Sequence, residues 1–229
     1  MRYELDKNDA FPSVKINMNQ GETMRIQSGS MVYRQGGVEL SAKLNKGSGG
    51  GLFSAVARSV TSGESMFLTE VSAPSAPGIV VISPELPGQI VELEVGAEQY
   101  CLNDKAFLAM DDTVNYQMVR QKLSKAVFSG QGGLFVMETT GQGTILINAF
   151  GSLDKIELDG TQEITIDNNH VIAWDRTLDF NIHFEGKGFF SSIGTGEGLV
   201  NTFRGRGTIY LQTLNIESFA KAVQPYIQV

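Results

Sequence analysis

The sequence predicts an all-β protein in which three related β-modules form a single domain. Three observations support this fold class. Apolar and polar residues alternate over many short stretches, glycine is frequent while proline is scarce, and the same features recur three times along the chain. Alternation with a period of two is typical of strands that bury one face. Glycines at short intervals are typical of the tight turns in hairpins.

The alternation is clearest at residues 14–18, 90–95, 164–166 and 178–184. The chain has 229 residues, of which 26 are Gly and 6 are Pro. A hydrophobic content of 41% is enough to build a sizeable core. We therefore expect short antiparallel strands joined by hairpins.

Three features recur in a fixed order, about 65 to 75 residues apart. An apolar run begins at Met31, Phe107 and Val171. A Gly precedes Glu or Gln at Gly63, Gly130 and Gly196. A Gly opens a strand at Gly78, Gly143 and Gly207. Because glycines and apolar residues keep the same phase, this recurrence indicates a triplicated unit.

The modules are expected at about residues 1–88, 89–153 and 154–215, followed by a C-terminal tail. A unit of this size cannot bury its own apolar face well. We therefore expect the modules to close around a pseudo-threefold axis, share one core and leave few sheet edges.

Helices are expected to be few and short. Residues 117–128 place Val119, Leu123 and Val127 at helical spacing, and residues 52–60 show the same spacing. Residues 216–223 precede Pro225, which would end a helix there.

The charge and the single cysteine narrow the functional classes. The net charge is −7 and no dense basic cluster is present, which argues against a nucleic-acid partner. Cys101 is the only cysteine, so no disulfide can form within the chain. The N-terminal residues are polar, and no stretch has the length of apolar sequence that spans a bilayer. We expect a cytoplasmic protein, with peripheral membrane association as an alternative.

No set of residues predicts a catalytic centre, a metal site or a cofactor. His170 and His183 are thirteen positions apart and form no His-x-His pair. Cys101 is expected to be a buried strand residue, and Asp111-Asp112 is expected to form a turn. The glycine run 47–51 is expected to be a loop, with an anion cradle as the alternative, because no Lys-Ser/Thr follows it.

An apolar segment precedes each of Gly63, Gly130 and Gly196, and Arg58, Arg120 and Lys187 are among the basic residues nearby. If the modules are equivalent, the three segments emerge on one face. They could dock to a membrane surface or a protein partner, mediate self-association, or pack in the core. The predicted interaction residues are Leu52, Phe53, Val56, Leu123, Val127, Phe128, Phe189, Phe190 and Ile193.

Nine stretches also carry a family resemblance, and they follow one another over nearly the whole chain. They are residues 49–53, 62–69, 84–91, 106–109, 133–135, 151–158, 170–173, 196–199 and 205–213. In this order they resemble the altered-inheritance-of-mitochondria protein twenty-four family, in its uncharacterised prokaryotic branch. The chain departs from the family pattern at Arg206, where relatives commonly have Pro, and at Asn201, where a small or apolar residue is usual.

The resemblance implies a β-fold related to the double-stranded β-helix and to the tryptophan RNA-binding attenuation protein. It also implies a family whose mitochondrial members are associated with inner-membrane organisation, and which has no established catalytic residues. The similarity to an RNA-binding fold is an analogy of fold alone.

Taken together, these observations predict a non-enzymatic scaffold or assembly protein that forms a homo-oligomer. It would dock to itself, to a protein or to a membrane surface through the repeated apolar segments. The alternative is a small-ligand binding module with a pocket at the barrel mouth or between modules. An enzyme would need a polar cluster assembled from residues distant in sequence.

Overall fold

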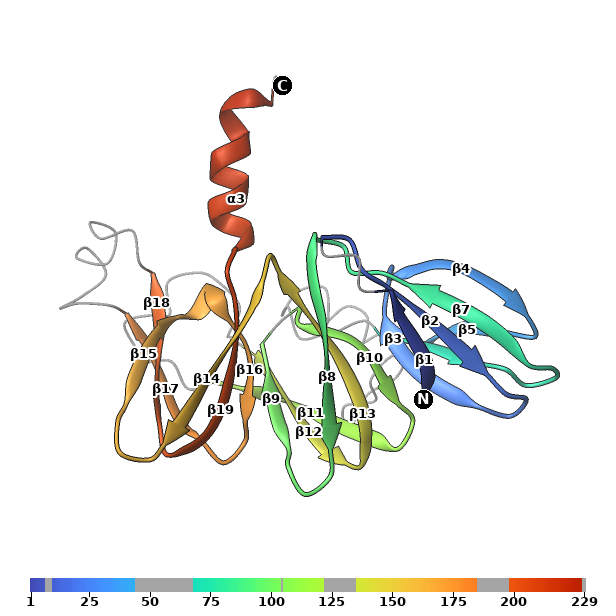
Figure 1. The fold of residues 1–229 in the computed structure, drawn as a ribbon, viewed down its shortest axis with the longest axis horizontal. Helices are drawn as coiled ribbons and strands as arrows, with labels where there is room; N and C mark the ends of the chain where they lie inside the picture. The colour runs from blue at the N-terminus through green and yellow to red at the C-terminus, as the bar shows by residue number, and fades with distance from the viewer. Residues whose placement is uncertain (7–9, 44–67, 104, 122–134, 185–197, 228–229) are drawn as a thin grey trace.

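The computed structural model describes residues 1–6, 10–43, 68–103, 105–121, 135–184 and 198–227. These residues form nineteen strands, two short 3-10 helices and one α-helix, so the expected all-β class is confirmed. Figure 1 shows the strands gathered into three groups that lie in a row. We name these groups the first module (β2–β7), the second module (β8–β13) and the third module (β14–β19).

The elements have the following bounds. The first module follows β1 (Arg2–Asp6) and contains β2 (Ser13–Met18), β3 (Thr23–Gln27), β4 (Met31–Gly36), β5 (Glu39–Lys43), β6 (Leu68–Ser72) and β7 (Gly78–Ile82). The second contains β8 (Gly88–Val95), β9 (Tyr100–Leu102), β10 (Phe107–Asp111), β11 (Val114–Arg120), β12 (Phe135–Gly141) and β13 (Gly143–Phe150). The third contains β14 (Leu153–Asp159), β15 (Ile164–Asp167), η2 (Asn168–His170), β16 (Val171–Asp175), β17 (Asp179–Phe184), β18 (Leu199–Arg204) and β19 (Arg206–Gln212). The chain continues with α3 (Ile216–Val223) and η3 (Gln224–Tyr226).

The same strand order occurs three times. Each module has a first half-sheet, in the order β2-β7-β4, β8-β13-β10 or β14-β19-β16. Each also has a second half-sheet, in the order β5-β6-β3, β11-β12-β9 or β17-β18-β15. All pairs are antiparallel, which agrees with the alternation in the sequence. β1 adds a further strand to the outer edge of β2.

Neighbouring modules are joined by strand pairing. The second half-sheet of the first module continues through β3–β10 into the first half-sheet of the second module. In the same way, β9–β16 joins the second module to the third. Each junction produces a six-stranded sheet. Among the described strands the pairing between modules ends at β4 and β15. The described modules therefore extend as a row and, contrary to expectation, do not close around one axis.

The buried apolar residues form three clusters, and each of them crosses a module boundary. Leu108 and Leu146 of the second module pack in the cluster of the first module, together with Ile26 and Val80. Ile172 of the third module packs in the cluster of the second module. The third cluster is centred on the fully buried Trp174 and includes Cys101 and Val136 of the second module. Adjacent modules therefore stabilise each other by sharing apolar cores.

One irregularity recurs in β4, β10 and β16. In each strand one additional residue interrupts the pairing with β7, β13 or β19, and these residues are Val32, Leu108 and Ile172. Such a bulge changes the direction in which the following side chains point. The three bulges identify β4, β10 and β16 as equivalent strands.

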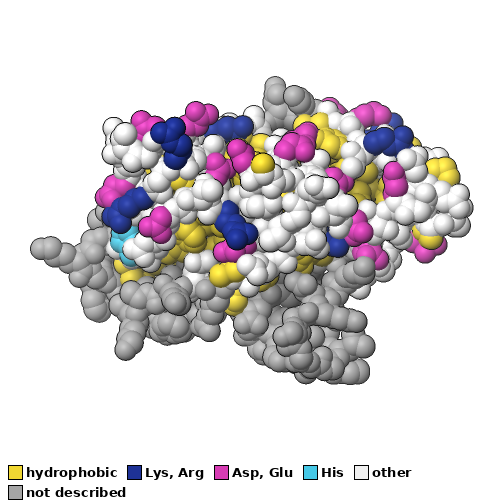
Figure 2. All heavy atoms as spheres, turned by 90° about the horizontal axis from the view of Figure 1, so that it is seen from below, with side chains coloured by type: hydrophobic (Ala, Val, Ile, Leu, Met, Phe, Trp, Pro, Cys, Tyr) yellow, Lys and Arg dark blue, Asp and Glu magenta, His cyan; other side chains and the backbone are white. Residues whose placement is uncertain are grey.

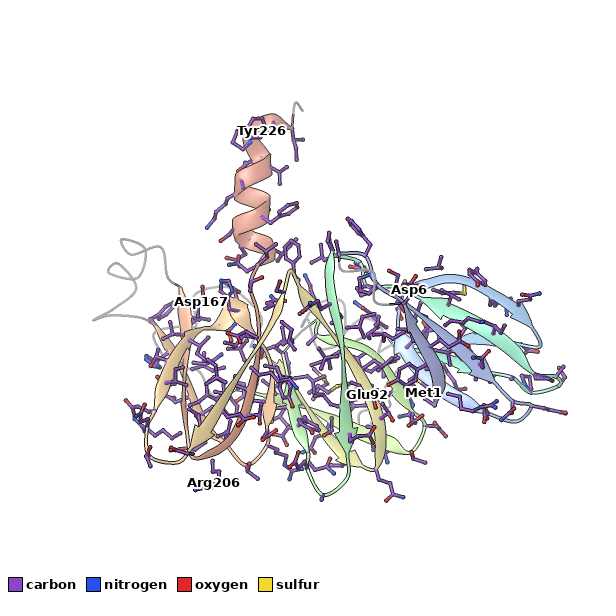
Figure 3. The ribbon with its side chains drawn as sticks, in the orientation of Figure 1. Met1, Asp6, Glu92, Asp167, Arg206 and Tyr226 are labelled. Atoms are coloured by element: carbon purple, nitrogen blue, oxygen red, sulfur yellow. The ribbon has the colours of Figure 1, made fainter. Side chains whose placement is uncertain are left out.

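The C-terminal helix was predicted at its observed position, Ile216–Val223. Asn215 caps its N-terminus, because the side-chain oxygen accepts a hydrogen bond from the Ser218 amide at 2.8 Å. Figure 1 shows α3 projecting away from the sheets, and Figure 3 shows Tyr226 at its far end.

The helix expected over residues 117–128 is wrong for its first four residues. Gln117–Arg120 is the end of β11, where each residue pairs with β12, from Val114 opposite Gly141 to Arg120 opposite Phe135. Pairing with a neighbouring strand outweighs a helical spacing that rests on three apolar residues. Residues 122–128 and the helix expected at 52–60 lie outside the described residues.

Candidate functional site

The predicted interaction residues all fall in segments that join the two strands of equivalent hairpins. The hairpins are β5–β6, β11–β12 and β17–β18. Leu52, Phe53, Val56, Leu123, Val127, Phe128, Phe189, Phe190 and Ile193 lie outside the described residues. Their role therefore stays a prediction, and the candidate surfaces below are built from the described strands and α3.

The two histidines serve separate parts of the third module. His170 links the end of β19 to the C-terminal helix: Nδ1–H donates to the Gln212 carbonyl oxygen at 2.7 Å, and Nε2 accepts from Asn215 Nδ2 at 3.1 Å. Asn215 is the residue that caps α3. His183 lies on β17, at the rim of a polar hollow. In the described part of the chain, no three His, Cys, Asp or Glu residues are placed to hold a metal ion.

Cys101 is buried, and the acidic residues Asp111 and Asp112 make contacts within the fold. Cys101 is buried on β9, and burial raises the pKa of its thiol to about 12. Asp111 accepts a hydrogen bond from the Thr144 amide at 2.8 Å, whereas Asp112 pairs with Arg25 at 2.9 Å. The two carboxylates therefore hold different partners.

Titratable groups also gather between the second and third modules. Burial raises the pKa of Asp175, Tyr100 and Tyr210, and the two tyrosine rings meet edge to face with centroids 6.4 Å apart. Asp175 accepts from the Thr208 amide at 2.7 Å. Because Asp111 makes the same bond at the equivalent position of the second module, this bond fixes the start of a strand, and we assign Asp175 no chemistry.

β4 forms the first candidate surface. All six of its residues are exposed, including Met31, Val32 and Tyr33. The equivalent strands β10 and β16 are buried over their first four residues. This contrast arises because β10 pairs with β3 and β16 pairs with β9, whereas no described strand pairs with β4 on that side.

β15 forms the second candidate surface, at the opposite end of the row (Figure 1). It pairs with β18 on one side and has an open edge on the other. Its apolar residues Ile164 and Ile166 are half-buried, although they pack against the third cluster. Such an open edge presents unpaired backbone groups and is a template for another strand.

The C-terminal helix forms the third candidate surface. Ile216, Phe219 and Val223 share one helix face, and Ile216 and Phe219 are exposed. The Phe219 ring meets Phe150 edge to face at 5.4 Å, which anchors the base of the helix to β13. Beyond it, Tyr226 and Ile227 are also exposed. No helix in the described ranges combines the length and the apolar character that crossing a membrane requires.

A polar hollow of about 500 Å³ opens on the sheet formed by β15, β18 and β17. Within it, Arg204 Nε lies 2.6 Å from Glu163, and the hydroxyls of Thr165 and Thr202 are 2.8 Å apart. Its lining residues are Glu163, Thr165, Asn181, His183, Phe184, Thr202 and Arg204.

Charge is mixed on the face that Figure 2 shows. Figure 2 shows Lys and Arg side chains interspersed with Asp and Glu on the face seen from below. A nucleic-acid binder gathers positive charge to neutralise phosphates. The face in Figure 2 does not present such a gathering among its described side chains.

Comparison with known proteins identifies the family. The family model described as mitochondrial biogenesis AIM24 matches residues 3–214. The chain belongs to this family. An uncharacterized protein of Streptococcus pyogenes serotype M6 is 53% identical to this AIM24 family member over 99% of the chain and 91% of the relative. A crystal structure of a S. pyogenes protein superposes with a TM-score of 0.84 at 50% identity, covering 99% of both chains.

Proposed function

We propose that the protein is a non-enzymatic assembly protein that works as a homo-oligomer. One observation carries this proposal: the large exposed apolar side chains of the described residues are concentrated at two places. Met31, Val32 and Tyr33 form a strip on β4, and Leu214, Ile216, Phe219, Tyr226 and Ile227 follow one another along the C-terminal segment. The remaining one is Phe11. Concentrated apolar surface is typical of protein interfaces.

The polar groups support an assembly role over a catalytic one. The buried titratable groups with raised pKa pack between modules, and Asp175 is engaged in the same backbone bond as Asp111. The hydrogen bonds of His170 link two elements of the third module. These polar contacts stabilise the fold. The exposed apolar surfaces are therefore the feature that best suits binding of a second copy.

A protein partner suits the C-terminal helix better than a lipid surface. Helices that lie on membranes carry several Lys or Arg residues on the polar face. α3 has one acidic residue, Glu217, and one basic residue, Lys221. The net charge of −7 would also repel anionic lipids.

The experiment is the solution mass of the full chain, measured by light scattering over a range of concentrations. We expect a mass that is a multiple of 24.9 kDa and that falls on dilution. A mass of one chain at every concentration would contradict the proposal. Flotation with phosphatidylglycerol vesicles gives the second readout, and we expect the protein to stay unbound.

A small-ligand binding module is the second candidate, and the polar hollow favours it. Its volume of about 500 Å³ is within the range of small-molecule sites, which is roughly 300–1,000 Å³. Arg204 and His183 would meet an anionic or hydrogen-bonding group there. A thermal shift with a library of small anions that disappears in Arg204→Ala would support this function, and an unchanged melting temperature throughout would oppose it.

A further inference from the structure

The two ends of the row carry complementary halves of one sheet. The internal six-stranded sheets each combine the second half-sheet of one module with the first half-sheet of the next. At one end of the row, the described part of the chain places no second half-sheet beside β4 of the first half-sheet β2-β7-β4. At the other end, the second half-sheet β17-β18-β15 has no first half-sheet beside β15. The strand types exposed at the ends are the same two types that pair twice inside the chain.

The bulged residues show what β4 lacks. Leu108 is 0% exposed and Ile172 is 3% exposed, whereas Val32 is 59% exposed. Leu108 is buried in the apolar cluster of the first module, and Ile172 in that of the second. Each of them therefore enters the core of the preceding module. Among the described strands β4 pairs only with β7, and Val32 enters none of the three clusters.

β15 shows the matching deficit from the other side. The strand equivalent to β15 in the first module is β3, where Met24 and Ile26 are buried. In the second module it is β9, where Tyr100 and Leu102 are buried. Ile164 and Ile166 occupy these positions on β15 and are only half-buried. In the first two modules, a strand of the next module covers this edge.

We infer that β15 of one copy pairs with β4 of a second copy, in the antiparallel manner of β3–β10 and β9–β16. This inference rests on the proposed homo-oligomer and names the contact that forms it. Within the chain, Ala109 lies opposite Ile26 and Ala173 lies opposite Leu102. The same register between copies places Tyr33 opposite Ile166, Arg34 opposite Thr165 and Gln35 opposite Ile164.

Charge is complementary across this pairing. Arg34 of one copy would lie diagonally across from Glu163 and Asp167 of the other, because both flank Thr165 by two residues. Opposite charges at such positions favour the pairing of these two edges, while the register itself follows from the two internal junctions. The pairing would complete a sheet equivalent to the two internal sheets. Because the two edges differ, the contact is head-to-tail, which produces rings or filaments.

The test is disulfide cross-linking between copies of the full chain. Arg34→Cys protein is mixed with Thr165→Cys protein under mild oxidation. The matched control replaces Thr165→Cys by Asn181→Cys, which is exposed on β17, the strand at the opposite edge of the same sheet from β15. We expect about tenfold more mixed dimer with Thr165→Cys than with Asn181→Cys, because a disulfide requires adjacent Cβ atoms. Mass spectrometry of the linked peptides identifies the joined residues.

The other possible results of the cross-linking and of the solution mass also decide whether the pairing occurs. Equal yields with the two partners would overturn the inference, and so would Arg34→Cys cross-linking mainly to itself, which indicates β4–β4 pairing. If the unmodified chain forms oligomers but the pair 34–165 does not link, the inference fails while the proposed function stands. If the unmodified chain is a monomer at every concentration, both fail.

A second measurement does not depend on introduced cysteines. Val32→Asp places a charge where a core position is expected, so we expect dissociation of the oligomer at about tenfold or higher protein concentration than for the unmodified chain. Phe11→Asp is the matched control, because Phe11 is 70% exposed and lies on neither open edge. Equal masses for the two variants on dilution would contradict the pairing.

Discussion

β4 and β16 are equivalent strands with opposite surroundings. Both carry a bulge at their second residue and pair on one side with the last strand of their module. β16 also pairs with β9 of the preceding module, and its first four residues are buried. No strand of the described ranges pairs with β4 on this side, and β4 is exposed throughout. The comparison teaches that burial of this strand depends on the module beside it, and that its apolar sequence alone does not determine its exposure.

The largest expected effect on stability comes from substituting the fourth residue of β16, compared with the fourth residue of β4. Trp174→Ala on β16 removes a fully buried ring that meets Phe180 at 4.8 Å and Phe203 at 5.5 Å. We expect the free energy of unfolding to fall by about 3–5 kcal/mol. Arg34→Ala at the same position of β4 should lower it by less than about 1 kcal/mol, since it removes one hydrogen bond, to the Val38 carbonyl.

Both values can be measured by urea unfolding at one dilute protein concentration, because assembly would add stability that depends on concentration. Comparable losses for the two variants would show that β4 is as buried in the free chain as β16 is.

The bulged position gives the second expected effect. Leu108→Ala should lower the free energy of unfolding by about 2–5 kcal/mol, because it opens a cavity in the core of the first module. Val32→Ala should change it by no more than about 0.5 kcal/mol, as is typical of exposed positions. Denaturant titration of the two variants beside the unmodified chain measures both changes. A loss above 1 kcal/mol in dilute Val32→Ala would mean that Val32 is covered within a single chain.

Equivalent glycines before β13 and β19 compare the second module with the third. Gly141 and Gly205 have φ of +87° and +104°, where any side chain costs about 1–2 kcal/mol. An added Cβ at Gly141 would lie 2.4 Å from the Thr113 carbonyl oxygen, whereas at Gly205 it would lie 3.8 Å from Leu178. Gly141→Ala should therefore lower the melting temperature more than Gly205→Ala. The reverse order in a thermal scan would indicate that the backbone at Thr113 and Gly141 moves apart at little cost.

The smallest expected effect concerns the last residue of β16. Burial raises the pKa of Asp175, so its protonated form is favoured in the folded state. The protonated carboxyl therefore stabilises the folded state fully at pH values below the ordinary carboxyl pKa. This stabilisation is lost as the pH rises through the raised pKa of the folded state. Asp175→Asn keeps an oxygen that can accept from Thr208, so its melting temperature should depend less on pH in this range.

β4 supplies the natural comparison, because it carries the neutral Gln35 where β16 has Asp175. Melting curves of Asp175→Asn and the unmodified chain between pH 4 and pH 8 measure the difference. Identical pH dependence in the two proteins would show that the Asp175 carboxyl is solvated in the folded state.

Much of this architecture could be predicted from local sequence. Alternation located β2, β8, β15 and β17, and residues 216–223 were expected to be helical up to Pro225. The helix expected at residues 117–128 failed at 117–120, because alternation and helical spacing overlap in so short an apolar pattern. The order of modules in a row could not be predicted, since strand pairing between modules leaves no local signal.

The candidate surfaces were missed for the same reason. Met31, Val32 and Tyr33 are as apolar as the equivalent residues of β10 and β16, so composition gave no indication that they are exposed. A signal was present one position later, where Arg34 stands in place of Met110 and Trp174. A charged residue at a core position of a repeat indicates a module at the end of a row.

The bulge also has a mechanical consequence. Within β10, Phe107 and Met110 belong to the core of the second module, while Leu108 and Ala109 belong to the core of the first. In β16, Val171 and Trp174 belong to the third core, and Ile172 and Ala173 to the second. Each of these two strands therefore contributes side chains to two adjacent cores. Disruption of one core is expected to destabilise the other. We expect the row to unfold in one cooperative step, unlike solenoids whose repeats fray from an end.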